Sequence, residues 1–216
     1  MPLLELLGGL LAPPLCWSCA GLVARGELLC RGCRLALHRL AAEPVRLAGV
    51  RVWAPVAYSG PARDLVRALK FRGAVHVADA MAAQIVANAP EPLPELDSAA
   101  GRPTLVPVPL HPRRLRSRGY NQAAAIADAL SRRTSIPLTD CLARTGLSIT
   151  QMGRNRAERK SGPVGSIDVV GIAPPRVLLV DDVVTTGATL AACREALAAA
   201  GSLEIAAVTF ARTIGR

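Results

Sequence analysis

The chain has 216 residues, of which 51% are hydrophobic and 3% aromatic, and its formal net charge is +10. This length allows one α/β domain of ordinary size and a small additional unit. The scarcity of aromatic residues predicts a core of Ala, Val, Leu and Ile, which suits helices packed on a sheet. The basic charge favours polyanionic partners, which are nucleic acid, phosphorylated small molecules or an acidic protein, and it does not choose among them.

The amino-terminal segment MPLLELLGGLLAPPLC is apolar, but it has no basic n-region and it carries Glu5. These features argue against a signal peptide. No apolar run in the sequence reaches the roughly 20 residues that are needed to cross a bilayer. We therefore expect a cytoplasmic protein without a membrane span, in a compartment where thiols stay reduced.

Four cysteines form two C-x2-C pairs, and ten residues separate the pairs. They are Cys16, Cys19, Cys30 and Cys33. One such turn points both of its sulfurs at one ion, and two turns complete a tetrahedral thiolate site. Two disulfides, idle thiols or iron are alternatives, but the expected reducing compartment favours structural zinc. We predict a zinc-binding unit over residues 1–45 and a second domain over residues 46–216.

Hydrophobic periodicity and turn residues predict the next elements. Residues 34–44 are expected to form a short helix and residues 50–60 a strand. Helices are predicted over 61–73 and about 74–88. The Pro-rich segment 89–103 is expected to be a loop or linker.

From residue 104 onward, predicted strands and helices alternate. The predicted order is strand 104–110, an Arg-rich loop, helix 120–133, strand 176–182, helix 188–200 and strand 203–212. This alternation implies a parallel sheet with helices on both faces. The isolated cysteines Cys141 and Cys193 are expected to lie in the core.

The stretch VLLVDDVVTTGATL (177–190) places Asp181 and Asp182 at the end of a predicted strand. Ligands of open α/β sheets lie beyond the carboxyl ends of the strands. The following turn opens a helix, and the free N–H groups of a helix N-terminus suit a phosphate. The residues of this turn are Thr185, Thr186, Gly187, Ala188 and Thr189.

Two carboxylates beside a phosphate require a group between them. A vicinal diol that donates hydrogen bonds to the carboxylates is one such group, and a divalent cation is another. A ligand with a phosphate on one side and a diol on the other is a sugar phosphate. Ribose 5-phosphate fits both requirements.

This stretch resembles the phosphoribosyl pyrophosphate signature of type I phosphoribosyltransferases. The resemblance implies that Asp181 and Asp182 contact the ribose hydroxyls. It also implies that the turn from Thr185 to Thr189 holds the 5′-phosphate. The fold class that it implies for residues 46–216 is α/β, with a phosphoribosyltransferase-like parallel sheet and flanking helices.

The order of the motifs resembles that of the ComF family of competence-associated proteins over nearly the whole chain. The motifs are the four cysteines, YSGPARDLVRALKFRG, LVPVPLHPRRLRSRGYNQA and the acidic stretch. The resemblance implies phosphoribosyl pyrophosphate or a related sugar phosphate as ligand and a link to DNA uptake on the cytoplasmic side. Single-stranded DNA and competence helicase-type proteins are the macromolecular partners that it implies.

Residues 144–167 are expected to form a loop over the site. This segment keeps Gln151 and Arg159 of the family pattern. It has KSGPV (160–164) where the family usually has an Asn, and the loop is therefore expected to differ from that of the family.

Basic residues dominate the part of the chain between Arg102 and Lys160, with 12 basic residues against three acidic ones. HPRRLRSRGYNQ follows a predicted strand, as the pyrophosphate loop of phosphoribosyltransferases does. We expect Arg113 and Arg118 to meet a pyrophosphate that carries Mg²⁺, with Gly119 allowing close backbone approach. Arginine and Mg²⁺ would stabilise the charge of departing pyrophosphate.

Other interpretations of the basic residues stay open. Several of these arginines could be solvated surface charge, or they could contact DNA phosphates without reading sequence. Lys70, in LKFRG, is interpreted as a surface lysine at a helix end, with anion binding as the alternative.

The function expected from the sequence is phosphoribosyl pyrophosphate binding linked to DNA uptake or DNA handling. A phosphoribosyltransferase with an unknown acceptor is one form of this function. A non-catalytic nucleotide-sensing or DNA-binding adaptor of the competence machinery is the alternative.

Overall fold

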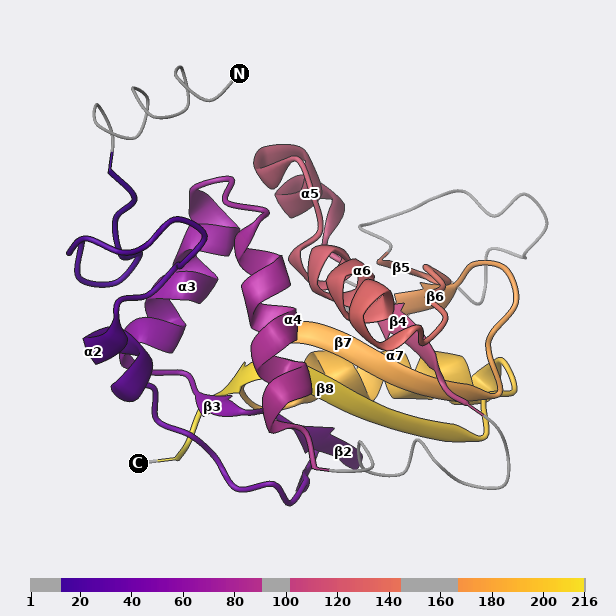
Figure 1. Ribbon diagram of the computed structural model, residues 1–216. Helices are drawn as coiled ribbons and strands as arrows, with labels where there is room; N and C mark the ends of the chain where they lie inside the picture. The colour runs from indigo at the N-terminus through magenta and orange to yellow at the C-terminus, as the bar shows by residue number, and fades with distance from the viewer. Residues whose placement is uncertain (1–12, 91–101, 145–166, 216) are drawn as a thin grey trace.

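The computed structural model describes residues 13–90, 102–144 and 167–215 (Figure 1). The predicted linker over 89–103 and the predicted loop over 144–167 lie almost entirely outside these residues. Gln151 and Arg159 also lie outside them.

One sheet of six strands organises the described residues, in the order β1-β2-β8-β7-β4 with β3 paired to β8. The strands are β1 (Val45–Leu47), β2 (Val50–Trp53), β3 (Val56–Ala57), β4 (Thr104–Pro107), β7 (Arg176–Val184) and β8 (Glu204–Arg212). Strand β1 pairs with β2 in antiparallel orientation, and the other pairs of this sheet are parallel. The predicted parallel sheet is therefore confirmed, with an antiparallel hairpin at one edge.

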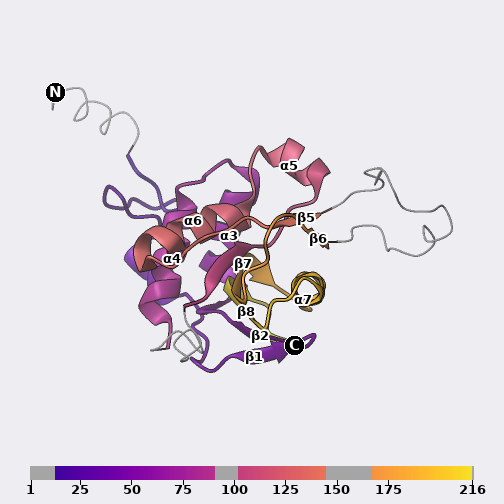
Figure 2. The same ribbon diagram turned by 90° about the vertical axis from the view of Figure 1, so that its right-hand side faces the viewer.

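Helices cover both faces of the sheet (Figures 1 and 2). One face carries α3 (Gly60–Phe71), α4 (Val77–Asn88) and α6 (Gln122–Thr134). The other face carries α7 (Ala188–Ala199) and the two-stranded antiparallel sheet of β5 (Leu142–Arg144) and β6 (Ile167–Val169). The predicted fold class is confirmed: an α/β fold with a mainly parallel sheet, flanking helices and an amino-terminal four-cysteine cluster.

Strand β7 divides its side chains between the two faces. Leu178 and Val180 pack in the core cluster that contains α3, α4 and α6. Val177 and Leu179 pack in the cluster that contains Cys193 of α7. This alternation is the period-two pattern of a strand, and burial on both faces is typical of a parallel sheet.

The helix predicted over residues 34–44 is wrong. The helix found there, α2, spans only Arg31–Leu35 and begins one residue after Cys30. The backbone N–H of Cys33 donates to the Cys30 sulfur, and this local contact sets the helix start. Beyond α2 the chain runs back toward the sheet, where Arg39 forms a bridge with Val56.

Two further predictions needed correction. The strand predicted over 50–60 is interrupted and forms β2 and β3. The predicted Arg-rich loop contains a short helix, α5 (Pro112–Arg118), because Pro112 suits the first turn and His111 caps it by accepting from the Arg113 N–H. The hairpin of β5 and β6 had no counterpart in the predictions.

The predicted boundary between residues 45 and 46 remains a prediction. Cys16, Leu29 and Leu37 are buried in the same cluster as residues of α3 and α4. The cysteine-containing segment accordingly lies beside α3 in Figure 1. Within the described ranges, no helix combines the length and apolar character that crossing a membrane would require.

Candidate functional site

The four amino-terminal cysteines come together as predicted. Their sulfur atoms all lie within 4.8 Å of one another, and the sulfurs of Cys19 and Cys30 are 3.7 Å apart. A tetrahedral zinc with bonds of about 2.3 Å separates its sulfur ligands by about 3.8 Å. A disulfide would require about 2.05 Å, and all four cysteines are free. The cluster therefore has the geometry to hold a zinc ion.

The cysteine unit contacts α3 and the segment that follows it. The Ser18 hydroxyl donates to the carboxylate of Asp64 at 2.7 Å. The ring of Trp17 lies 5.6 Å from that of His76, and the Arg72 guanidinium lies 5.9 Å from the Trp17 ring centroid. These polar and aromatic contacts join the unit to the face of the sheet that carries α3.

Asp182 lies near the carboxyl end of β7, on the face that carries α3. It is buried, with 4% of its surface exposed. One carboxylate oxygen, Oδ1, pairs with the Lys70 ammonium at 2.9 Å. The other, Oδ2, is buried and has no hydrogen-bond partner among the described residues. This carboxylate therefore has one oxygen engaged and one available to a donor.

Asp181 has different surroundings from its neighbour. Its Oδ1 accepts the backbone N–H of Asp182 at 2.8 Å. Burial, together with the negative charge of Asp182, raises the pKa of Asp181 to about 7. Burial and the Asp181 charge in turn raise the pKa of the Cys193 thiol to about 12, which places Asp181 toward α7. Near neutral pH the carboxylate pair thus carries less than two full charges, which reduces the conflict with a nearby phosphate.

The turn after β7 leads directly into α7. Gly187 has a φ of +80°, and a Cβ at this position would lie 2.9 Å from the Cβ of Leu47. Glycine is therefore required both by the backbone conformation and by the space available. The Thr186 hydroxyl accepts the Ala188 N–H at 3.4 Å, and Thr185 and Thr186 are exposed. The turn presents hydroxyls at the start of a helix.

The last residue of α5 and the loop that follows it contact the end of α3. The Arg118 guanidinium lies 5.2 Å from the Phe71 ring centroid and donates to Gln122 at 2.9 Å. The Tyr120 hydroxyl donates to the carbonyl of Leu69. Burial raises the pKa of Tyr120, and the Asp182 charge contributes to this shift. Arg118, Tyr120 and Asp182 therefore surround the end of α3.

The two other residues predicted to meet the pyrophosphate, Arg113 and Gly119, have no described contact with the acidic pair. Arg113 is exposed on α5, and its described contact is the backbone bond to His111. Gly119 ends α5 with a φ of +79°, and a Cβ there would meet nothing within 4 Å. In the free chain Gly119 is thus explained by its conformation, and the close approach to a ligand stays a prediction.

Lys70 is the site residue that sequence reasoning missed. The sequence favours a surface lysine, with anion binding as the alternative, but the Lys70 side chain is 24% exposed and pairs with the carboxylate of Asp182. The available signal was a basic residue in the last turn of a helix that ends before Gly73. That signal explains why a lysine suits the helix end, but it does not reveal which strand lies opposite.

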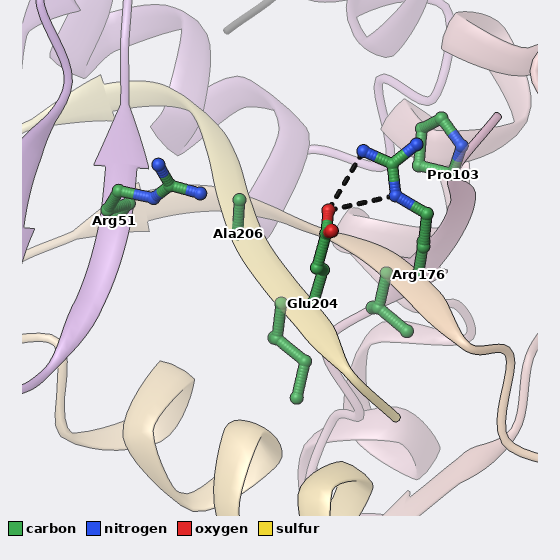
Figure 3. Close-up of a pocket in the computed structure, with 7 residues that line it drawn as sticks. Arg51, Pro103, Arg176, Glu204 and Ala206 are labelled. Carbon is green, nitrogen blue, oxygen red and sulfur yellow. Dashed lines mark hydrogen bonds and ion pairs between the residues drawn. The ribbon is translucent and has the colours of Figure 1, made fainter. Parts of the chain in front are cut away.

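A pocket lies at the amino ends of β7 and β8, opposite the end of the sheet that holds the acidic pair (Figure 3). Arg176 opens β7 and Glu204 opens β8, and they form an ion pair at 2.9 Å. Arg51 of β2 also lines the pocket. Because ligand sites of open α/β sheets lie at the carboxyl ends of the strands, we assign this pocket no ligand.

The chain resembles one curated protein over part of its length. It is 37% identical to Competence protein F from Haemophilus influenzae over 91 residues, which make up 40% of each protein. The match thus spans less than half of that relative. No family model matches the chain.

Solved structures similar to the chain include several phosphoribosyltransferases. A purine phosphoribosyltransferase from Pyrococcus horikoshii aligns with a TM-score of 0.36 and 21% identity, over 66% of this chain and 74% of that one. A hypoxanthine phosphoribosyltransferase from Staphylococcus aureus aligns with a TM-score of 0.35 and 16% identity, over 64% of this chain and 62% of that one.

The partial resemblance to Competence protein F agrees with the order of the sequence motifs, and the four cysteines form a cluster that could hold a metal ion. Over the matched 40% of its length, the chain resembles a competence protein of the ComF type.

Proposed function

We propose that this protein binds phosphoribosyl pyrophosphate at the carboxyl ends of the strands of its sheet. Asp181 and Asp182 would accept hydrogen bonds from the ribose hydroxyls, and the turn from Thr185 to Thr189 would hold the 5′-phosphate. The observation that carries the proposal is the buried Oδ2 of Asp182, which has no hydrogen-bond partner in the part of the chain that the structure describes and lies three residues before a turn that opens a helix. A hydroxyl donor and a phosphate on one ligand satisfy both features.

The basic side of the site would receive the pyrophosphate. Arg118 lies beside the end of α3, and Arg113 and Gly119 belong to the same short segment. Arginine donors suit phosphate oxygens, and Mg²⁺ bound with the pyrophosphate would reduce its charge. Zinc in the four-cysteine cluster would have a structural role, because four thiolates leave no open coordination position.

The biological setting that we propose is DNA uptake or DNA handling in the cytoplasm. The partial match to Competence protein F supports this setting. Transfer of the phosphoribosyl group to an acceptor is one activity of such a site. A nucleotide-sensing or DNA-binding adaptor that does not catalyse transfer is the second candidate, supported by the exposed arginines of α5.

Phosphoribosyl pyrophosphate with Mg²⁺ is expected to raise the melting temperature of the purified protein. At 100 times the dissociation constant the stabilisation is about 2.7 kcal/mol. For a protein of this size that corresponds to a shift of about 5–10 °C. Ribose 5-phosphate and inorganic pyrophosphate, tested separately by differential scanning fluorimetry, should give smaller shifts. No shift with the complete ligand at millimolar concentration would refute the proposed binding, and pyrophosphate release with candidate acceptors would identify a transferase.

If the arginines of α5 bind single-stranded DNA, affinity should be independent of sequence and should fall steeply with salt. Each phosphate contact contributes about −0.7 to the slope of log K against log salt concentration. Replacing Arg113 and Arg114 with Ala should therefore reduce the magnitude of the slope by up to about 1.4. Fluorescence anisotropy across a salt series measures the slope. Binding that does not respond to salt, or to this double replacement, would exclude α5 as the contact surface.

A further inference from the structure

Lys70 projects from the last turn of α3, close to the acidic pair. Helix α3 ends at Phe71, and Gly73 follows with a φ of +65°. A lysine in the last turn is favoured there by the partial negative charge of the helix C-terminus. Its ammonium nevertheless points to Asp182 of β7, at 2.9 Å from Oδ1. The ion pair thus joins two elements that lie more than 100 residues apart in the chain.

Both neighbours of Lys70 in the chain are contacted by the end of α5 and the loop that follows it. The carbonyl of Leu69 accepts the Tyr120 hydroxyl. The ring of Phe71 lies under the Arg118 guanidinium, 5.2 Å from ring centroid to Cζ. These contacts hold the end of α3 over the end of β7, so the lysine reaches Asp182 from a restrained backbone.

The Lys70 contact uses only one of the two oxygens of Asp182. The side chain of Asp182 is 6% exposed, and its Oδ2 has no hydrogen-bond partner among the described residues. A buried carboxylate oxygen without a donor is costly, so a donor supplied by a ligand would be favourable. The ammonium fixes the orientation of the carboxylate and thereby the position of the free oxygen.

We infer that Lys70 is a positioning residue of the site: its ammonium holds the Asp182 carboxylate so that Oδ2 meets a hydroxyl of the sugar ligand. This inference rests on the proposed function and adds a residue to it. Lys70 also offsets the charge of the acidic pair. Its positive charge lowers the pKa of Asp181, against the larger effects of burial and of Asp182 that raise it. On the other face, the charges of Asp181 and of Arg144 of β5 act on the Cys193 thiol of α7.

The test compares three variants in binding phosphoribosyl pyrophosphate with Mg²⁺ by isothermal titration calorimetry between pH 6 and 9. Lys70→Met removes the charge but keeps much of the side-chain length, and Lys70→Arg keeps the charge. Arg67→Met is the matched control, because Arg67 is exposed one turn earlier on the same helix. We expect Lys70→Met to weaken binding at least about tenfold, which one charged hydrogen bond can account for. Lys70→Arg should recover most of this loss, and Arg67→Met should bind like the unmodified protein.

The pH profile separates positioning from general destabilisation. Without the Lys70 charge the pKa of Asp181 should rise further, so the pH below which affinity declines should move upward in Lys70→Met. Loss of structure alone would not move this midpoint, and circular dichroism of each variant records the fold. Unchanged affinity and midpoint in Lys70→Met would overturn the inference, as would an equal loss in Arg67→Met.

Failure of the proposed function gives a different result. If the unmodified protein does not bind phosphoribosyl pyrophosphate, the proposed function fails and the positioning of its sugar hydroxyl fails with it. If the unmodified protein binds and Lys70→Met binds equally well, the proposed function stands and only the role of Lys70 is overturned. Carboxyl-carbon NMR of the free protein then shows directly whether the acidic pair responds to the loss of Lys70.

Discussion

Replacing Cys30 with Ser is expected to weaken zinc binding and to lower the zinc content of the purified protein. Structural zinc in small domains contributes about 10–16 kcal/mol of binding free energy at neutral pH. Loss of one of four thiolates should remove about a quarter of this, or about 3 kcal/mol, which weakens zinc binding at least about a hundredfold. Cys30 has a second role, because its sulfur accepts the Cys33 N–H at the start of α2. Inductively coupled plasma mass spectrometry of protein purified under reducing conditions measures the zinc content.

The effect of this replacement should spread beyond the four cysteines. Ser18 and Trp17 contact α3 and the segment after it, so loss of metal should loosen those contacts. Hydrogen exchange should rise first in residues 13–37 and next at the end of α3, with β7 and β8 protected. Cys141→Ser is the matched control, because Cys141 is buried far from the cluster along the chain and should leave the zinc content unchanged. Unmodified protein without zinc would contradict the prediction directly.

Replacing Asp182 with Ala is expected to weaken binding of phosphoribosyl pyrophosphate about ten- to a hundredfold. One charged hydrogen bond contributes roughly 1.5–3 kcal/mol, and this carboxylate is the one with a free buried oxygen. Asp181→Ala should weaken binding over the same range, and the double replacement should abolish measurable binding. Isothermal titration calorimetry with Mg²⁺ present gives the affinities. A double variant with unmodified affinity would show that the ribose is not held at these residues.

The two acids should differ in their effect on the free protein. The pKa of Asp181 is raised to about 7, whereas a carboxyl of the unfolded chain titrates near 4. Between about pH 4 and pH 7 the folded state therefore binds more protons than the unfolded state. The free energy of unfolding should accordingly fall as the pH rises through this range. Asp181→Asn should flatten this decline, because it removes the titrating group. If the free energy of unfolding falls equally with pH in Asp181→Asn, the decline is caused by other residues.

The features that the sequence predicted depend on local patterns. The four-cysteine cluster follows from two turns of fixed spacing, and the chemistry of thiolates restricts what such a spacing can do. Helices α3, α4, α6 and α7 follow from apolar residues repeated at helical intervals. The position of Asp181 and Asp182 follows from a continuous apolar run, because such a run is typical of a buried parallel strand.

The features that the sequence did not predict depend on contacts between distant segments. Nothing near Lys70 indicates that α3 ends over β7, since that placement depends on how Tyr120 and Arg118 hold the helix end. The helix expected over 34–44 failed because Arg39 and its neighbours bridge to the sheet, which outweighs a modest local helical preference. Strands β5 and β6 have three residues each, too few to show a period.

The order of the strands has a consequence for how the chain folds during its synthesis. Strand β8 pairs with β2, β3 and β7, yet all three precede it in the chain. Until β8 leaves the ribosome, β2 and β7 have no neighbour between them and expose unpaired apolar edges. Pairing across such long separations is slow, and intermediates with exposed edges are prone to aggregate. Nascent chains of this protein should therefore depend on chaperones that shield those edges until β8 has left the ribosome.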